Sequence, residues 1–190
     1  MLYAQRGEMA DPYIIVIDTE TTGLPQHEWA AITSFSAVTL DSGLDVVGIE
    51  SMDIRPDVLD ERALPALSIQ NRTLADIEAH LHTNADLMAL IADIQSRWST
   101  EDTPSVWTAY NLPFDKEMLR RSGVDVDSLK WGDCCMQTAM KVLGSKRWLK
   151  LKVAAEQLGA VVHDTHNATS DALLAAAVLR RCAYRLLGAK

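Results

Sequence analysis

The chain has 190 residues, enough for one domain with a substantial hydrophobic core, and its length does not require a second domain. Hydrophobic residues make up 48% and charged residues 23%, as in ordinary globular proteins, and no segment is apolar for long enough to suggest a membrane span. The formal net charge of −8, from 18 basic and 26 acidic residues, argues against a protein that binds polyanions tightly through a broad basic surface.

The first predicted elements are strands. The run Tyr13–Ile17 is continuously apolar and rich in β-branched residues, which is typical of a central strand buried on both faces. Two more strands are predicted over Ile32–Leu40 and Val46–Ile54, and Asp41-Ser42-Gly43 between them reads as a hairpin turn. Three successive strands of this kind predict an antiparallel meander at the start of a mixed sheet.

Helices dominate the rest of the chain. Leu87, Leu90, Ile91 and Ile94 recur at helical spacing, and Asn111 followed by Pro113 is a helix-start signature. The predicted elements are a helix opening at Thr73–Ile77, a helix over Asp86–Trp98, a strand over Val106–Tyr110, a helix from Asn111 to about Gly123, a helix over Leu151–Leu158 and a last helix from about Ala168 to Leu187. Strands first, then alternating strands and helices, indicate an α/β or mixed α+β domain.

The ends of the chain and its cysteines bear on location. Residues 1–12 are polar and unpatterned, so we expect a mobile tail ahead of a single domain over residues 13–190, with no signal peptide. Cys134 and Cys135 are adjacent and poorly placed to bridge each other, and with Cys182 the count is odd. These features predict an intracellular, cytoplasmic protein without a disulfide framework and without a membrane partner.

Two acidic residues end the first predicted strand. Asp18 and Glu20 are two residues apart, so their carboxylates project from the same face. A polar turn that closes the strand is the ordinary explanation of such a pair. However, two like charges on one face are unfavourable without a cation or a hydrogen-bonding partner, which points to a metal.

Two further acids lie near helix starts. Asp115 is in the first turn of its helix, beside the apolar residues Met118 and Leu119, and Asp171 continues the apolar stripe of the last helix. A favourable interaction with the helix dipole is the simpler reading of Asp115. Together, the four inward acids predict a site for two Mg²⁺ or Mn²⁺ ions, which prefer carboxylate and water ligands and can cleave phosphodiester bonds as a pair.

Three motifs occur in order along the chain: Asp18-Thr19-Glu20-Thr21-Thr22-Gly23-Leu24, Asn111-x-x-Phe114-Asp115 and His166-x-Ala168-x-x-Asp171. They resemble the exonuclease motifs of the DEDDh group, the family of polymerase proofreading exonucleases and related DNA- and RNA-trimming enzymes. The resemblance extends from Tyr13 to about Leu187. It implies a ribonuclease H-like fold with a central mixed five-stranded sheet flanked by helices, and metal-dependent 3′→5′ exonuclease activity.

The resemblance also implies roles for individual residues. Asp18, Glu20 and Asp171 would bind metal ions directly, and Asp115 would complete the acidic set. His166, five residues before Asp171, fits the histidine version of the third motif, whereas the alternative version needs tyrosine where this chain has Asn167. His166 would be the general base, and His163 does not fit the spacing. The expected contacts to substrate are made by Thr21, Thr22, Gly23, Leu24, Asn111 and His166, with Leu24 as a wedge near the terminal base.

Some residues depart from the family pattern or lie outside it. The stretch Ala66–Thr73 resembles the family segment that lines the terminal nucleotide, but Pro65 just before it stands where many members have glutamate. Cys134 stands where threonine is common. Trp29 follows the first motif closely and is a minor candidate for substrate contact. The densest basic cluster is the best candidate for phosphate contact, although a solvated surface is the default reading; it comprises Lys146, Arg147, Lys150 and Lys152.

The sequence therefore predicts an enzyme that removes nucleoside 5′-monophosphates from free 3′ ends of nucleic acid, with DNA favoured. An enzyme that trims RNA or short oligoribonucleotides is the main alternative, because discrimination depends on contacts with the 2′-hydroxyl. A binding module that has kept the fold and lost catalysis is the second alternative, and the complete acidic set argues against it. A polymerase partner is compatible with the resemblance, but the residues do not indicate one.

Overall fold

The computed structural model describes residues 11–162 and 167–188. A five-stranded sheet of order β3-β2-β1-β4-β5 lies at its centre. The first three strands form an antiparallel meander, whereas β4 and β5 run parallel to β1. The strands are β1 (Ile14–Thr21), β2 (Ile32–Leu40), β3 (Val46–Asp53), β4 (Val106–Ala109) and β5 (Lys130–Trp131). The mixed sheet and its opening meander are therefore confirmed.

The two faces of β1 pack against different cores. Ile15 and Ile17 point into one core, which also holds Phe35 and Trp107, and Val16 points into the other. This alternation is the period-two geometry of a strand. It also places successive residues further along β1 on opposite faces of the sheet, and the positions of the acids follow from it.

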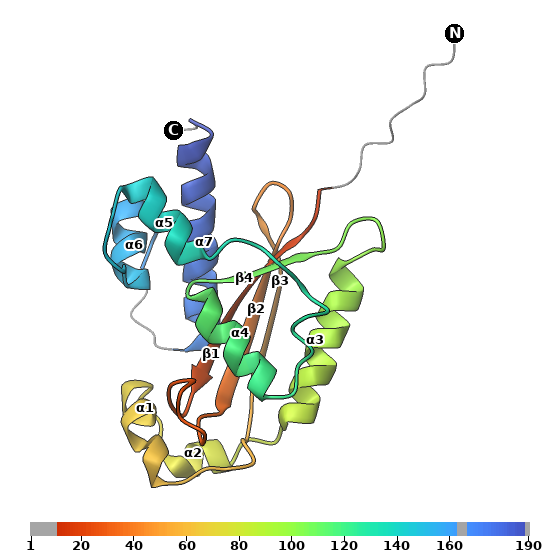
Figure 1. Cartoon of the computed structure of the whole chain (residues 1–190), viewed down its shortest axis with the longest axis vertical. Helices are drawn as coiled ribbons and strands as arrows, with labels where there is room; N and C mark the ends of the chain where they lie inside the picture. Colours follow the sequence, from red (N-terminus) through yellow and green to blue (C-terminus); the bar gives the residue numbers. More distant parts are fainter. Residues whose placement is uncertain (1–10, 163–166, 189–190) are drawn as a thin grey trace.

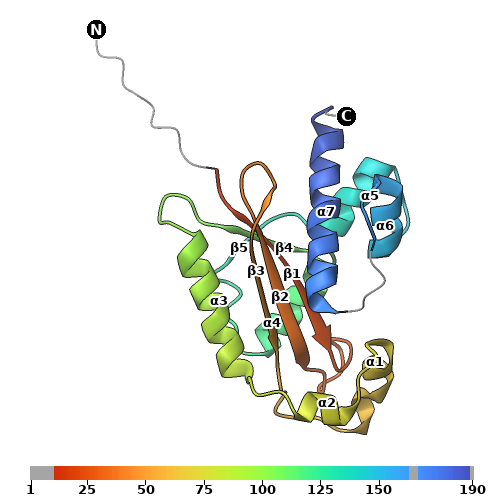
Figure 2. The ribbon, with the colours of Figure 1, turned by 180° about the vertical axis from the view of Figure 1, so that it is seen from behind.

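Helices cover both faces of the sheet (Figures 1 and 2). On one face lies α7 (Ala168–Leu186), which packs against β1 and β2 and carries α5 (Cys135–Leu143) and α6 (Leu151–Leu158) at its side. On the other face lie α3 (Asn84–Trp98) and α4 (Leu112–Arg121), whose apolar residues join Ile15 and Ile17 in the first core. None of the described helices combines the length and apolar character needed to cross a membrane.

A small layer of short helices lies beyond the carboxyl end of β1, as Figure 1 shows. It consists of the 3₁₀ helix η1 (Glu61–Ala63), α1 (Leu64–Ile69) and α2 (Leu74–Glu78). Leu67 and Ile77 form its own small core with Ala63. This layer forms one wall of the pocket described below.

The predicted elements lie close to their expected bounds, and four of the observed elements have no counterpart in the prediction. These four are η1, α1, α5 and the two-residue strand β5. Neither α1 nor α5 has a side-chain hydrogen bond at its N-cap, so the usual start signal is absent. Asn111 is the N-cap residue of α4 by position, as the helix-start signature predicts, but its side chain does not form the capping bond.

The parallel pairing of β1 with β4 determines where the site forms. Ile17 pairs with Ala109, so the carboxyl ends of both strands reach the same edge of the sheet. Ligand sites of open sheets with parallel strands commonly lie outside these ends. Asp18 and Glu20 lie within the last residues of β1, and α4 begins just after β4.

Candidate active site

Three carboxylates meet at the carboxyl end of β1. Asp18 and Glu20 project from the face of β1 that α7 covers, and Asp171 lies in the first turn of α7. One carboxylate oxygen of each residue lies within 4.8 Å of the others, and all three side chains are partly buried. This set of oxygen ligands suits a divalent cation such as Mg²⁺ or Mn²⁺.

The electrostatics of the cluster favour a bound cation. Burial, together with the charges of Asp115, Asp171 and Glu20, raises the pKa of Asp18 well above its ordinary value. Burial and the charge of Asp171 raise the pKa of Glu20 to about 6, although Arg72 partly opposes this rise. Without a cation, the cluster is under pressure to take up protons. A metal ion relieves the same repulsion, so the residues present fit the ions that the fold implies.

Asp115 lies on the opposite side of β1 from the other acids. Its carboxylate is buried, and Oδ1 accepts a hydrogen bond of 2.8 Å from the hydroxyl of Thr19. Thr19 lies between Asp18 and Glu20 in sequence, so its side chain points to the α4 face. Burial raises the pKa of Asp115, and the hydrogen bond from Thr19 lowers it in part. The structure therefore brings three of the four predicted acids together and holds the fourth nearby, through Thr19.

His166 and the competing His163 lie outside the described residues. The neighbouring Asn167 is described: it is the N-cap of α7, and its side chain accepts a hydrogen bond of 2.9 Å from the amide of Ser170. This is the position at which the alternative form of the third motif has its tyrosine. Asn167 is thus used to start α7, which places Asp171 one turn into the helix.

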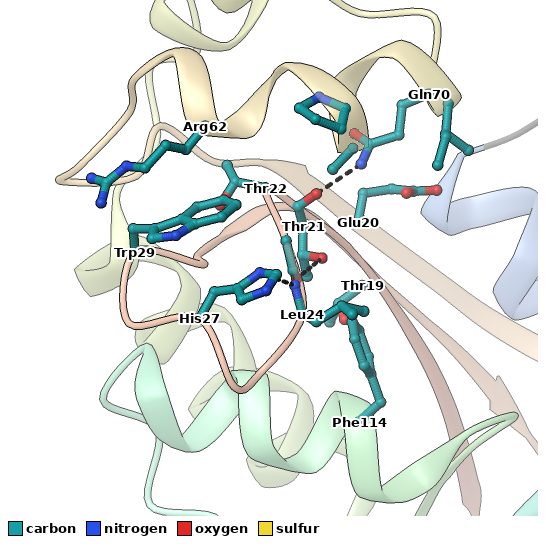
Figure 3. A pocket seen from close by; sticks show the side chains of 14 residues that line it. Thr19, Glu20, Thr21, Thr22, Leu24, His27, Trp29, Arg62, Gln70 and Phe114 are labelled. Atoms are coloured by element: carbon teal, nitrogen blue, oxygen red, sulfur yellow. Dashed lines mark hydrogen bonds between the residues drawn. The ribbon is translucent and has the colours of Figure 1, made fainter.

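A pocket of about 540 Å³ opens next to Glu20, between the loop after β1 and helix α1 (Figure 3). Its walls are largely apolar: Leu24 and Phe114 lie on one side, and Ile69 of α1 lies on another. Leu24 is 49% exposed although it is apolar, and so is a surface available to a ligand. The volume and apolar lining suit a small organic group, with the carboxylate of Glu20 at its edge.

Polar groups of the loop after β1 are largely used to hold the loop itself. The hydroxyl of Thr21 donates to the carbonyl of Gly23 at 2.9 Å, and the hydroxyl of Thr22 accepts from the amide of Ala31 at 2.9 Å. The amide of Leu24 donates to Nδ1 of His27 at 3.4 Å. Among the described residues, the amide of Gly23 has no such partner. Of the predicted substrate contacts in this loop, Gly23 therefore offers a backbone donor, whereas the two threonine hydroxyls stabilise the turn.

Trp29 packs against this loop and also lines the pocket. Its ring stacks on His27, with centroids 4.9 Å apart and planes inclined by 13°, and the guanidinium of Arg62 lies 5.5 Å from the Trp29 centroid (Figure 3). A Cβ added to Gly23 would lie 2.8 Å from two carbons of the Trp29 ring. Trp29 is therefore a packing surface for the glycine of the first motif.

Several residues of the site are not evident from the motifs alone. Gln70 donates to the carbonyl of Thr21 at 2.9 Å, and so ties α1 to the end of β1. Arg121 of α4 donates three hydrogen bonds to loop carbonyls, at 2.7 Å to Pro25, 2.8 Å to His27 and 2.6 Å to Glu28. No sequence pattern predicts the contacts of Gln70 or Arg121, because all of their acceptors are backbone carbonyls far away in sequence.

Comparison with known proteins agrees with this geometry. The family model named RNase_T, described as "Exonuclease", matches residues 15–179. Comparison with the sequences of curated proteins gives no match. Among solved structures, that of Escherichia coli exonuclease I in complex with a dA16 oligonucleotide is similar, with a TM-score of 0.73 and 20% identity over 94% of this chain and 42% of that one. The zinc-bound complex of E. coli exonuclease I with single-stranded DNA gives a TM-score of 0.69 and 21% identity, over 90% and 40% of the two chains.

The chain therefore spans about two fifths of the length of the exonuclease I chains. At this level of identity, the likeness establishes the fold, which agrees with the predicted ribonuclease H-like arrangement. The family model covers most of the chain independently of these structures.

Proposed function

Since the chain belongs to the exonuclease family, the DEDD-type hydrolytic 3′→5′ exonucleases, we propose that it removes nucleoside 5′-monophosphates from the 3′ ends of nucleic acid. The observation that carries the proposal is the three-carboxylate cluster of Asp18, Glu20 and Asp171, of which Glu20 also lines the 540 Å³ pocket. A cation site beside a pocket for a small organic group is the arrangement needed to cut one nucleotide from a chain end.

Asp18, Glu20 and Asp171 would hold the divalent cations, and Asp115 would add a fourth negative charge from across β1. The ions would supply Lewis-acid activation of water and stabilise the charge that develops on the phosphate oxygens. Thr19 would keep the carboxylate of Asp115 oriented through its hydrogen bond. His166 is proposed as the general base that accepts the proton of the attacking water, in accordance with its place in the third motif.

The pocket would receive the terminal nucleoside. Leu24 and Phe114 offer apolar surface to the base, and the amide of Gly23 offers a hydrogen-bond donor. The family to which the chain belongs acts in the 3′→5′ direction, so the nucleoside in the pocket would be the 3′-terminal one.

Single-stranded DNA is the proposed substrate. Three of the exonuclease I structures that this chain resembles are complexes with single-stranded DNA, a dA16 oligonucleotide and a dT13 oligonucleotide. The same chemistry would act on RNA if the pocket accepts a 2′-hydroxyl, so RNA is a comparison arm of the experiment rather than a separate proposal.

The test uses 5′-labelled single-stranded DNA, duplex DNA and RNA of the same sequence, incubated with protein and Mg²⁺ or Mn²⁺. We expect a ladder that shortens from the 3′ end, with single-stranded DNA degraded fastest. Chelator and Asp18→Asn should each abolish the ladder, because the cluster then lacks its cations or one of its carboxylate ligands. Asp127→Asn is the control, since the side chain of Asp127 is 80% exposed and belongs neither to the carboxylate cluster nor to the pocket lining. Degradation that persists in chelator, or faster cutting of RNA, would contradict the proposal or its choice of substrate, respectively.

A further inference from the structure

Basic charge is concentrated in one part of an acidic chain. Residues 134–155 contain five lysine or arginine residues and no aspartate or glutamate, although the whole chain carries a net charge of −8. The segment includes α5, the connection between α5 and α6, and most of α6. A charge distribution of this kind marks a surface that can attract a polyanion locally.

The cations of the connection are not neutralised by the protein. Lys146, Arg147 and Lys150 are exposed, and none of them forms an ion pair with a carboxylate in residues 11–162 or 167–188. Elsewhere, five arginines are paired with one or two carboxylates each: Arg62, Arg72, Arg97, Arg120 and Arg180. Other exposed cations of the described residues, such as Arg55 and Lys130, also lack an ion pair, so the distinguishing feature of this connection is its density of three unpaired cations within five residues.

Trp148 lies between these cations and is 59% exposed. An indole exposed to this degree forgoes much of the free energy that burial would provide, so its position favours a role in binding. Alternating cations and an exposed aromatic ring are the combination that binds single-stranded nucleic acid, because the cations contact phosphates and the ring stacks on a base.

The connection is anchored beside the active site. The carbonyl of Leu149 accepts a hydrogen bond of 2.9 Å from the hydroxyl of Tyr110, which directly follows β4. Because Ile17 pairs with Ala109, Tyr110 lies next to Asp18 at the end of the neighbouring strand. The backbone is also fixed by the hydroxyl of Ser145, which donates to the carbonyl of Arg147 at 2.9 Å. The exposed side chains of Lys146–Lys150 thus belong to a segment with a fixed backbone, and Tyr110 connects this segment to the strand ends that carry the carboxylate cluster.

We propose that the segment Lys146–Lys150 binds the portion of a single-stranded nucleic acid that precedes its terminal nucleotide. Trp148 stacks on a base, and Lys146, Arg147 and Lys150 bind phosphates. This inference rests on the proposed exonuclease function and adds a second contact region outside the pocket. It explains how an acidic protein holds a polyanion: the favourable potential is confined to the path of the strand.

The binding test avoids hydrolysis. In an Asp18→Asn background and without metal, binding of 5′-fluorescein-labelled oligodeoxythymidylate is measured by fluorescence anisotropy at several salt concentrations. We expect Trp148→Ala to weaken binding about tenfold, as for the removal of one stacked base. Trp148→Phe should restore most of the affinity, since phenylalanine keeps a ring. The triple change of Lys146, Arg147 and Lys150 to alanine should flatten the dependence of log K on log salt by about 0.7 for each phosphate that is no longer bound.

Lys130→Ala is the matched control, because Lys130 is also exposed but pairs with Val106 at the opposite end of β4. It should leave both affinity and salt dependence unchanged. Affinity of Trp148→Ala equal to that of the parent, or an equal effect of Lys130→Ala, would overturn the inference. A blunt duplex bound as strongly as the single strand, with no effect of Trp148→Ala, would also overturn it, since stacking needs unpaired bases.

A kinetic test separates binding from structural effects on the active site. With Asp18 intact and Mg²⁺ present, Trp148→Ala should raise KM for a long oligonucleotide and leave kcat/KM for a dinucleotide unchanged. An equal loss on both substrates would show that Trp148 acts by supporting the site, and would overturn the inference. If the parent protein degrades no nucleic acid, the proposed exonuclease function fails. The anisotropy experiment still tests separately whether Lys146–Lys150 binds single-stranded nucleic acid.

Discussion

Gly23 has no side chain at a point where Trp29 leaves no room for one. An added Cβ would lie 2.8 Å from Cη2 and Cζ3 of Trp29 and 3.1 Å from Nδ1 of His27. His27 and Arg62 flank the indole, so the ring cannot move away freely. The glycine of the first motif is therefore required here by close packing, and not by an unusual backbone conformation.

We expect Gly23→Ala to destabilise the protein by about 1–3 kcal/mol, the usual cost of overpacking, and to lower kcat/KM because the loop with Leu24 shifts. Trp29→Phe lacks both clashing carbons, so the double variant should recover stability. Denaturant unfolding of the four proteins gives the coupling free energy. Additive effects of the two changes would contradict this steric explanation.

The alternation of residues along β1 explains what the sequence predicts of the acids and what it does not. Two acids at i and i+2 necessarily share a face, so the proximity of Asp18 and Glu20 follows from the strand alone. The hydrogen bond between Thr19 and Asp115 does not follow from the alternation along β1. Thr19 donates to Asp115 only because α4 covers the other face of the sheet, which is a tertiary arrangement.

At the scale of elements, Arg121 connects α4 to the loop after β1. Its guanidinium donates to three carbonyls of that loop, and it forms no ion pair within the described part of the chain. Helix α4 carries Asp115 and Phe114, whereas the loop carries Gly23 and Leu24. Arg121 thus fixes the distance between two walls of the pocket.

We expect Arg121→Met to cost about 2 kcal/mol or more of unfolding free energy, because three carbonyls then lack their charged donor. KM for nucleic acid should rise more than kcat falls, since the pocket walls separate. Arg121→Lys should rescue little, because an ammonium cannot serve three carbonyls in the planar geometry of a guanidinium. Steady-state kinetics and urea denaturation provide the two measurements.

Arg120→Met is the control for Arg121. Arg120 is exposed, and its ion pairs with Glu117 and Asp127 lie at the surface, where such pairs contribute little. Equal losses in the Arg120 and Arg121 variants would show that general destabilisation of α4, and not the clamp on the loop, accounts for the effect.

The elements that the sequence predicts well are those with a clear period or start signal. Helix α2 begins at a capping box of Thr73 and Asp76, and β2 is apolar or small throughout. Helix α1 lacks a polar N-cap and has Leu64, Pro65 and Ile69 exposed, so its pattern does not distinguish it from a loop. Periodicity therefore cannot predict the pocket wall that α1 forms, although the family resemblance points to this stretch.

At the scale of the whole molecule, the carboxylate cluster links stability to pH. The pKa of Glu20 is about 6 in the folded protein against an ordinary value of 4.5, so the native state binds more protons than the unfolded state between these values. The free energy of unfolding without metal therefore falls as pH rises through this window. For Glu20 alone the fall amounts to about 2 kcal/mol, and the raised pKa values of Asp18 and Asp115 act in the same direction.

We expect the Tm in chelator to decrease from pH 5 to pH 8, and Mg²⁺ to raise Tm much more at pH 8 than at pH 5. A metal concentration 100 times Kd would add about 2.7 kcal/mol. Asp18→Asn should reduce the fall with pH and remove the effect of Mg²⁺, because it takes away one repelling charge and one ligand. Differential scanning fluorimetry measures all of these values. A Tm in chelator that rises from pH 5 to pH 8 in the parent, but not in Asp18→Asn, would contradict this sign.

The division of β1 between two cores restricts how the chain can vary in length. Insertion or deletion of one residue between Ile17 and Asp18 would exchange the two faces for the rest of β1. The carboxylates would then point under α4, and the threonine would face Asp171. A substitution within this stretch can reduce activity partially. A change of length by one residue moves both carboxylates to the wrong face at once. The number of residues between the buried part of β1 and Asp18-Thr19-Glu20 therefore determines which face the carboxylates occupy. The site depends on this number as strongly as on the identity of the residues.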